Sequence, residues 1–298
     1  MIAVCLKWVD RRPEADTVVG AASAPDERFA GVSAADQAAL EWALRQRDAS
    51  AASGSGTTSA GAGGTSSGAG RETVVAVTVG PAAADAVLRD ALAAGADRAV
   101  RIDRPFDTPS RSVATDLAGV LGDANTIWCG DYSFDRGTGS VPAFLAHELG
   151  IGQALGLVSI EISPAAGDGD ERDRGRIEAL RRLDGGRRER LAISGRAVLS
   201  VEGGTARLRR ASLRGLLAKP AIEIVRPLAG NPTPPPTDAR PFRPRPRAFA
   251  APVGATALDR IRLLTAAGTA AAHGETVTLD PAEAAERILT TLREWGYI

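Results

Sequence analysis

Glycines and hydroxyl-bearing residues gather in the stretch Gly130–Ser140, directly after a short apolar run. Gly137 and Gly139 would let backbone N–H groups come close to an anion. The hydroxyls of Thr138 and Ser140 can each donate a hydrogen bond to a phosphate oxygen. A helix that begins at this point would add partial positive charge from its N-terminus. The pattern predicts a phosphate-binding loop, and the alternative is a glycine-rich turn in which Ser140 caps the helix.

This loop differs from the two common nucleotide-binding fingerprints, because it neither matches Gly-x-Gly-x-x-Gly nor carries a Walker lysine. A second polar segment, Asp184-Gly185-Gly186, offers a carboxylate. An Asp-Gly pair between two strand-like runs is typical of a hairpin turn, so we favour a turn over a catalytic acid there.

Few other residues offer catalytic or metal-binding chemistry. The chain of 298 residues has two histidines and two cysteines. No acid or thiol cluster accompanies His147 or His273, so we expect neither a metal site nor a Ser-His-Asp triad. Cys5 and Cys129 are far apart in the sequence and each lies in an apolar run, which argues against a disulfide framework and fits a reducing compartment. Nothing next to Cys5 would activate its thiol, so we expect it to be a small packed residue.

These candidates require an α/β framework to position them. Short β-branched runs alternate with alanine-rich segments of helical periodicity, which is typical of a mostly parallel sheet covered by helices. A doubly wound sheet of this kind places its ligand-binding loops at the carboxyl ends of the strands. We expect strands at 2–9, 72–79, 98–103 and 126–130, and helices at 33–47, 84–94, 111–121 and 140–149. Ser33 or Asp36 could cap the first helix.

Later segments depart from this alternation. A polar stretch at 164–176 reads as a hairpin tip, and the apolar runs around it read as strands of an antiparallel excursion at 157–162, 177–183, 188–193 and 197–201. The Ala/Gly/Ser/Thr tract at 48–71 has no periodicity and is expected to be a disordered insertion.

The carboxyl-terminal part reads as an extended arm. Residues 227–252 are rich in proline, which cannot form a central strand or helix. Residues 281–295 have the spacing of an amphipathic helix. We therefore predict a nucleotide-binding domain at 1–226, and at 227–298 an arm with a terminal helix that packs on a partner.

Composition limits the classes of partner. The formal net charge is zero, and acidic residues interleave with the arginine runs, so nucleic acid is not an expected partner. No stretch approaches the apolar length of a membrane helix. The apolar start meets a charge at Lys7 and has no cleavage site, which favours a buried strand over a signal peptide. We expect a soluble, cytoplasmic protein, and the high alanine, arginine and proline content indicates a GC-rich genome such as that of an actinobacterium.

Six local strings, in the same order along the chain, resemble the electron-transfer flavoprotein β family, which includes the FixA-type subunits. The most specific is Leu88–Ala99, which follows Val79-Gly80-Pro81 and is similar to an Arg-x-Ala-Leu-Ala-x-Gly-Ala-Asp-Arg string of the family. The others lie at 2–9, 36–44, 182–191, 211–219 and 283–298.

The resemblance implies a fold, a function and cofactors. The fold would be Rossmann-like, of the adenine nucleotide α-hydrolase-like kind, and the chain would work as the β subunit of a heterodimer. It would carry electrons from a flavin dehydrogenase to a downstream acceptor by means of FAD held mainly by an electron-transfer flavoprotein α subunit. This chain would hold a structural AMP, or the adenosine half of a second FAD as in electron-bifurcating members. A stand-alone regulator that binds an adenine nucleotide is the alternative from another class.

The resemblance also implies roles for particular residues. Cys5 and Val79 would lie beside the adenine, and the turn Ser33, Ala34, Ala35 and Asp36 would contact the base or the ribose. The phosphate would lie on the loop that contains Gly130, Asp135, Gly137, Thr138, Gly139 and Ser140. Leu213 would anchor a partner dehydrogenase in a recognition loop.

Three departures from the family pattern affect these roles. The family's Asn-Pro-Phe/Tyr-Asp turn is replaced here by Ser33-Ala34-Ala35-Asp36, and the nucleotide loop is shorter. A polybasic stretch after the recognition loop is missing, which leaves Lys219 alone. Without that stretch, the resemblance does not identify the dehydrogenase.

Overall fold

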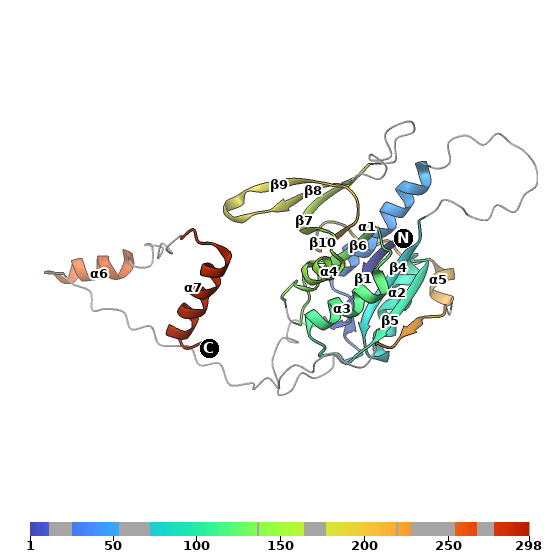
Figure 1. Ribbon diagram of the computed structural model, residues 1–298, viewed down its shortest axis with the longest axis horizontal. Coiled ribbons are helices and arrows are strands. Elements are labelled where there is room, and N and C mark those ends of the chain that lie inside the picture. Colours follow the sequence, from blue (N-terminus) through green and yellow to red (C-terminus); the bar gives the residue numbers. More distant parts are fainter. Residues whose placement is uncertain are drawn as a thin grey trace, which may run out of the picture. The chain divides into compact units, whose positions relative to one another are not determined.

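The computed structural model of the chain describes residues 1–11, 26–53, 72–135, 137–163, 177–218, 220–227, 254–266 and 277–297. The chain divides into two compact units, Met1–Ala239 and Arg240–Ile298. The first contains one large sheet with its helices (Figure 1), and the second contains helices α6 (Ala257–Ala266) and α7 (Pro281–Glu294). The proline-rich segment expected at 227–252 lies, apart from its first residue, outside the described residues.

The first unit is organised around a nine-stranded sheet in the order β11-β5-β4-β1-β6-β10-β7-β8-β9. Neighbouring strands from β11 to β7 are parallel, whereas β7, β8 and β9 pair antiparallel. The bounds are β1 Ile2–Cys5, β4 Val74–Gly80, β5 Arg98–Asp103, β6 Thr126–Gly130, β7 Gly152–Ile162, β8 Ile177–Arg182, β9 Arg188–Ile193, β10 Ala197–Val201 and β11 Glu223–Val225. A separate antiparallel pair joins β2 (Val9–Asp10) to β3 (Ala30–Gly31). The predicted α/β class with a mostly parallel sheet is confirmed.

Helices cover both faces of the parallel part of the sheet. One apolar cluster contains Leu44 of α1 (Ala34–Ser53) and Leu88 of α2 (Asp85–Ala94). The other contains Leu117 of α3 (Ser110–Leu121) and Leu145 of α4 (Val141–Leu149). Residues of the central strands alternate between the two clusters, as the two-residue period of a strand requires. The result is a doubly wound sheet with a core on each face.

Two expected boundaries near the N-terminus are wrong. The first strand ends at Cys5 rather than at residue 9, because the chain turns there into the pair β2–β3. Helix α1 runs to Ser53, so that residues 48–53 of the expected disordered insertion are helical. Alanines in this last part favour continuation of the helix, and Ser50 Oγ donates to the carbonyl of Gln46 at 3.1 Å. Residues 54–71 of that insertion lie outside the described residues.

The antiparallel excursion is confirmed for β7, β8 and β9 but is wrong for residues 197–201. That segment is β10, which pairs parallel with both β6 and β7 and is buried along its whole length. A continuous apolar run is typical of a strand buried on both faces, and this distinguishes Ala197–Val201 from the alternating pattern of β9. The expected hairpin tip at 164–176 lies outside the described residues.

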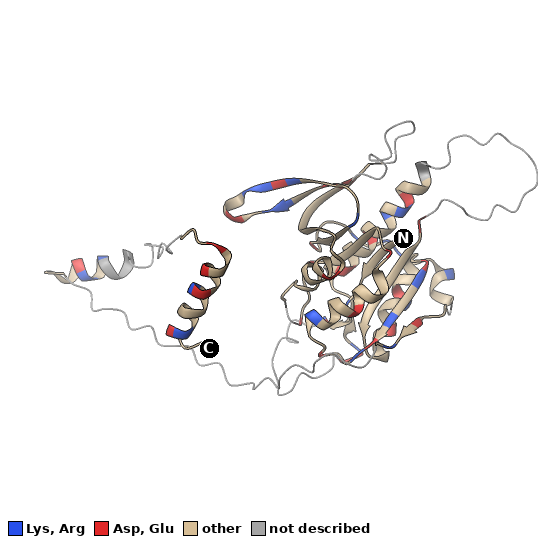
Figure 2. Ribbon diagram, in the orientation of Figure 1, with Lys and Arg blue, Asp and Glu red and all other residues tan. Residues whose placement is uncertain are grey.

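The turn expected at Asp184-Gly185-Gly186 is confirmed between β8 and β9, where both glycines have positive φ (67° and 74°). The short edge strand β11 was not predicted, because three residues are too few to show a period. Figure 2 shows charges of both signs interspersed along β8, β9 and α7.

Helix α1 is locked to strand β6 by a buried polar network. Gln46 Nε2 donates to Thr126 Oγ1 at 3.0 Å, and Trp128 Nε1 donates to Gln46 Oε1 at 2.8 Å. The rings of Trp42 and Trp128 stack with centroids 6.4 Å apart. Because these polar groups are buried, each bond that is lost leaves a partner without compensation from water. The network therefore fixes the register of α1 on the sheet.

A matched pair of threonines tests this argument. Among the described residues, Thr78 Oγ1 on β4 is a buried side-chain oxygen without a hydrogen-bond partner, whereas Thr126 Oγ1 is bonded to Gln46. We expect Thr78→Val to leave the free energy of unfolding unchanged or to raise it, and Thr126→Val to lower it by about 1–2 kcal/mol. Urea unfolding of both variants measures the difference, and an equal loss in both would contradict the assignment.

Candidate functional site

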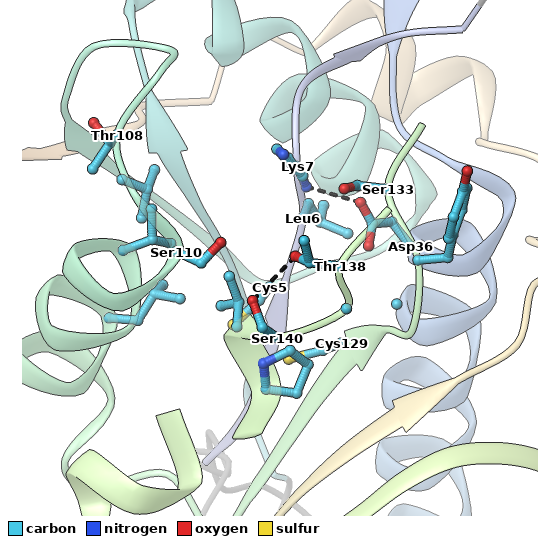
Figure 3. Close-up of a pocket in the computed structure, with 18 of the residues that line it drawn as sticks. Cys5, Leu6, Lys7, Asp36, Thr108, Ser110, Cys129, Ser133, Thr138 and Ser140 are labelled. Atoms are coloured by element: carbon cyan, nitrogen blue, oxygen red, sulfur yellow. Dashed lines mark hydrogen bonds between the residues drawn. The ribbon is translucent and has the colours of Figure 1, made fainter. Parts of the chain in front are cut away.

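A pocket opens where the carboxyl ends of β1 and β6 meet (Figure 3). From β1 the chain moves outward to β4 and β5, and it then returns to the other side of β1 to form β6. The pocket therefore lies at the point where the strand order reverses, which is where open α/β sheets bind their ligands. Its lining residues are Cys5, Leu6, Lys7, Asp36, Val77, Val79, Pro105, Phe106, Thr108, Ser110, Val113, Leu117, Cys129, Gly130, Tyr132, Ser133, Thr138, Gly139, Ser140, Val141 and Pro142.

The lining combines an apolar part with several hydroxyl groups. Aliphatic side chains come from β4 and α3, namely Val77, Val79, Val113 and Leu117. Hydroxyls come from the loops after β5 and β6 and from the first residue of α3, namely Thr108, Ser133, Thr138, Ser140 and Ser110. An apolar cavity with a few polar groups is the usual composition of a small-molecule site.

Glycines shape the loop after β6. Gly139 has φ +55°, and a Cβ built there would lie 2.3 Å from the carbonyl oxygen of Asp131. Gly137 has φ +62°, and its Cβ would lie 3.1 Å from the ring of Tyr132. Positive φ combined with such close contacts requires glycine at both positions.

The end of this loop opens helix α4 without a side-chain cap. Ser140 occupies the N-cap position, but its hydroxyl makes no capping bond; it lies 3.1 Å from Thr138 Oγ1. Figure 3 shows this pair of hydroxyls in the pocket. The interpretation of Ser140 as a side-chain cap is therefore wrong, and both hydroxyls line the pocket beside the N-terminus of α4.

Asp36 is the buried acid of the site. Ser33 caps α1, because its Oγ accepts a hydrogen bond from the backbone N–H of Asp36 at 3.0 Å. The carboxylate of Asp36 is thereby free of the capping role, and it accepts the backbone N–H of Lys7 at 2.9 Å. Burial raises the pKa of Asp36 to about 7, although hydrogen bonds from the backbone N–H groups of Lys7 and Gly130 oppose the shift.

Lys7 connects the end of β1 to the loop after β6. Its Nζ lies 2.5 Å from one carboxylate oxygen of Asp135 and 2.6 Å from the other. The Asp135 side chain is 17% exposed, so this ion pair is partly shielded from water. The pair holds the loop over the strand end.

The structure brings seven of the sequence-predicted residues to the pocket: Cys5, Asp36, Val79, Gly130, Thr138, Gly139 and Ser140. The other predicted residues take different places. Ser33 caps α1, and Asp135 pairs with Lys7. Ala34 packs against Gly203, the backbone of Ala35 lies against Gly130, and Gly137 contacts Tyr132.

Sequence reasoning missed several lining residues. Lys7 and Cys129 both lie near the end of a strand that the sequence predicts. This position was a usable signal, because the carboxyl ends of parallel strands meet at one edge of the sheet. Thr108 and Ser110 follow β5, and the same signal applies to them. The contact of Cys5 with Cys129 depends on strand order, which a single sequence does not reveal.

Leu213 lies far along the chain from these residues, at the start of the short helix α5 (Leu213–Leu217) rather than in an irregular loop. Ser212 caps this helix through a hydrogen bond from the N–H of Gly215 at 3.0 Å. Leu213, Leu216 and Leu217 are exposed by 72%, 60% and 73%. Three leucines exposed on one turn of helix form an apolar patch that can contact another protein.

The fold and the pocket together define a class, that of doubly wound α/β proteins with a pocket at the switch point of the sheet. A model of the electron transfer flavoprotein domain matches residues 57–224, which is more than half of the 298 residues. The chain belongs to the electron transfer flavoprotein family, and it is similar to a FixA protein and to a β subunit of that family.

Two curated relatives support this placement. Protein FixA of Bradyrhizobium diazoefficiens is 34% identical over 122 residues, which cover 38% of this chain and 40% of the relative. The electron transfer flavoprotein subunit beta of Methylophilus methylotrophus is 32% identical over 158 residues, which cover 51% of this chain and 57% of the relative. The chain thus spans about half the length of the curated relatives it matches.

Two kinds of feature are absent from the described residues. Within those ranges, no helix is both long and apolar enough to cross a membrane. The same part of the chain contains no group of three or more His, Cys, Asp or Glu side chains that could hold a metal ion.

The raised pKa of Asp36 predicts a pH effect on stability. Between the ordinary aspartate pKa near 4 and the folded value of about 7, the folded chain keeps a proton that the unfolded chain loses. The free energy of unfolding should therefore fall as pH rises through this window, by about 1.4 kcal/mol per pKa unit, and level off above it. Asp36→Asn should remove this slope, and urea unfolding of both proteins from pH 4 to 8.5 measures it. Parallel curves would show that Asp36 does not titrate in this way.

Proposed function

We propose that this chain is the β-type subunit of an electron-transfer flavoprotein. It pairs one-to-one with an α-type subunit that holds the redox FAD, and it binds an adenine nucleotide, AMP, in its own pocket. The observation that carries the proposal is the pocket at the switch point of the sheet, lined by Thr138, Ser140 and Asp36, in a chain of this family.

The pocket residues fit an adenine nucleotide in two respects. The aliphatic side chains of Val77 and Val79 offer a surface on which a base can pack. Thr138 and Ser140 offer hydroxyl donors, and Gly139 brings backbone close to the same place. Because its pKa is about 7, Asp36 can either donate or accept a hydrogen bond near neutral pH. The nucleotide would then have a structural role in this chain.

FAD, when bound by the pair of subunits, supplies the electron-transfer chemistry. This chain would close one side of the flavin cleft and so exclude water from it. Its own residues would fix position and electrostatics and would not react. The donor would be a flavin dehydrogenase, and the electrons would pass to a downstream acceptor.

The apolar patch of α5 supports docking to that dehydrogenase. Leu213 is 72% exposed and stands at the N-terminus of the helix, with Leu216 and Leu217 on the same turn. A stand-alone regulator would have no need for such a patch, which favours the subunit over that alternative. Leu213 would enter an apolar pocket of the dehydrogenase as the anchor of the contact.

A second FAD in place of AMP is the other nucleotide that this pocket could take, and extraction distinguishes the two. Denaturing the purified chain and identifying the released nucleotide by mass spectrometry should give AMP. Release of FAD, together with a yellow colour in the absence of the α-type subunit, would favour a bifurcating subunit. Release of neither, with no rise in melting temperature when either is added, would contradict nucleotide binding.

A threonine pair tests the phosphate contact. Thr138→Val removes a hydroxyl from the pocket at nearly constant volume, and the loss of a hydrogen bond to a charged group costs about 1.5–3 kcal/mol. We expect AMP affinity to fall about ten-fold or more, as measured by isothermal titration. Thr115→Val is the control, because Thr115 is exposed on α3 and its hydroxyl bonds to the Arg111 carbonyl. Equal affinities of the two variants would contradict the assignment.

The proposed heterodimer can be tested through α7. Its described residues include none that is buried, and Ile288 and Trp295 are exposed by 60% and 58%. We expect co-expression with an α-type subunit to give a 1:1 complex, and deletion of residues 281–298 to weaken it. Size-exclusion chromatography with light scattering measures both. A stable monomer in the presence of the α-type subunit would count against the proposal.

A further inference from the structure

The only two cysteines of the chain meet in the pocket. Strands β1 and β6 are parallel neighbours, and Cys5 stands directly opposite Cys129 in their register. Both side chains point to the same face of the sheet, since both belong to the apolar cluster under α3 and α4. Neighbouring strands lie about 4.8 Å apart, which is within the range of about 4.4–6.8 Å between the Cα atoms of a disulfide. The two cysteines are far apart in the sequence but are neighbours in the sheet, and both are free thiols in the structure.

The two thiols differ in their access to solvent. Cys5 is half-buried and Cys129 is buried with 3% exposure, and both line the pocket. Figure 3 draws both cysteines among the residues that line this pocket, together with Thr138 and Ser140. A hydrogen bond with the Cys5 thiol, together with burial, raises the pKa of Cys129. A reagent that enters the pocket should therefore react first at Cys5, with Cys129 in position to react second.

We propose that Cys5 and Cys129 form a dithiol that a small hydroperoxide, entering through the pocket, converts reversibly into a disulfide. The Cys5 sulfur attacks one oxygen of the peroxide, the O–O bond breaks, and Cys5 becomes a sulfenic acid while one molecule of water or alcohol leaves. The Cys129 sulfur then attacks the Cys5 sulfur, the S–O bond breaks, and a second molecule leaves as water. In total the two sulfurs lose two electrons and two protons, and the peroxide is reduced by the same two electrons.

The disulfide would join the two central strands on which the pocket is built. A bound nucleotide, if the pocket holds one as proposed above, should shield Cys5 and slow the oxidation. The dithiol proposal does not depend on this effect. Unchanged oxidation rates with added AMP would count against nucleotide binding. They would not count against the formation of the disulfide.

The experiment uses the full chain, reduced and then treated with hydrogen peroxide. Thiols are counted in denaturant, and the intact mass is measured before and after treatment. We expect both thiols to disappear, the mass to fall by about 2 Da as two hydrogens leave, and the chain to stay monomeric on a non-reducing gel. A peptide that links Cys5 to Cys129 should be found, and dithiothreitol should restore both thiols.

Single-cysteine variants separate the two steps. Cys129→Ala should stop at a sulfenic acid on Cys5 that dimedone traps, and Cys5→Ala should leave Cys129 unreacted in the folded chain. The wild-type measurements stand even where one variant fails to fold. Retention of both thiols, a disulfide-linked dimer, or added oxygen without the mass loss would each overturn the proposal.

Discussion

The close approach of helix α1 to the ends of two strands is the constraint on which the site depends. A Cβ at Gly130, the last residue of β6, would lie 2.4 Å from Asp36 Oδ1 and 2.9 Å from the Asp36 backbone nitrogen. A Cβ at Gly203, just after β10, would lie 2.9 Å from the Ala34 Cβ. The first turn of α1 thus fits against β6 and the segment after β10 only because both of these positions are glycine. This contact buries Asp36, turns its carboxylate toward the Lys7 amide, and forms one wall of the pocket.

The central framework could be predicted from the sequence because local patterns determine it. β-branched runs and alanine-rich helices alternate over 2–149, and only their ends were misplaced. The prediction for strand β10 was wrong because its continuous apolar run indicates burial on both faces but does not identify the strands beside it. Its neighbours are set by non-local pairing with β6 and β7, about which the five residues Ala197–Val201 carry no local information.

The site could be predicted only in part from local sequence patterns. Residues of one continuous loop, such as Thr138 and Ser140, could be identified because glycine and hydroxyl spacing are local features. The relation of Cys5 to Cys129 could not, since 124 positions separate them and only the strand order makes them neighbours. Asp135 lies in the predicted loop, and its ion pair with Lys7 from another element could not be predicted from the sequence.

The segment that joins α1 to β4 is attached far from the pocket, and this affects which changes in sequence length the chain can tolerate. Helix α1 starts at the pocket and runs away from it to Ser53, and β4 starts again at Val74 on the amino edge of the sheet. The first attachment point of the Ala/Gly/Ser/Thr tract is therefore at the far end of α1 from the pocket, and the second is at the opposite edge of the sheet. Insertions and deletions there cost little, because the closure entropy of a loop changes slowly with its length. The connections at the amino edge of the sheet can therefore vary in length without loss of function. At the carboxyl edge, close contacts limit which residues are tolerated.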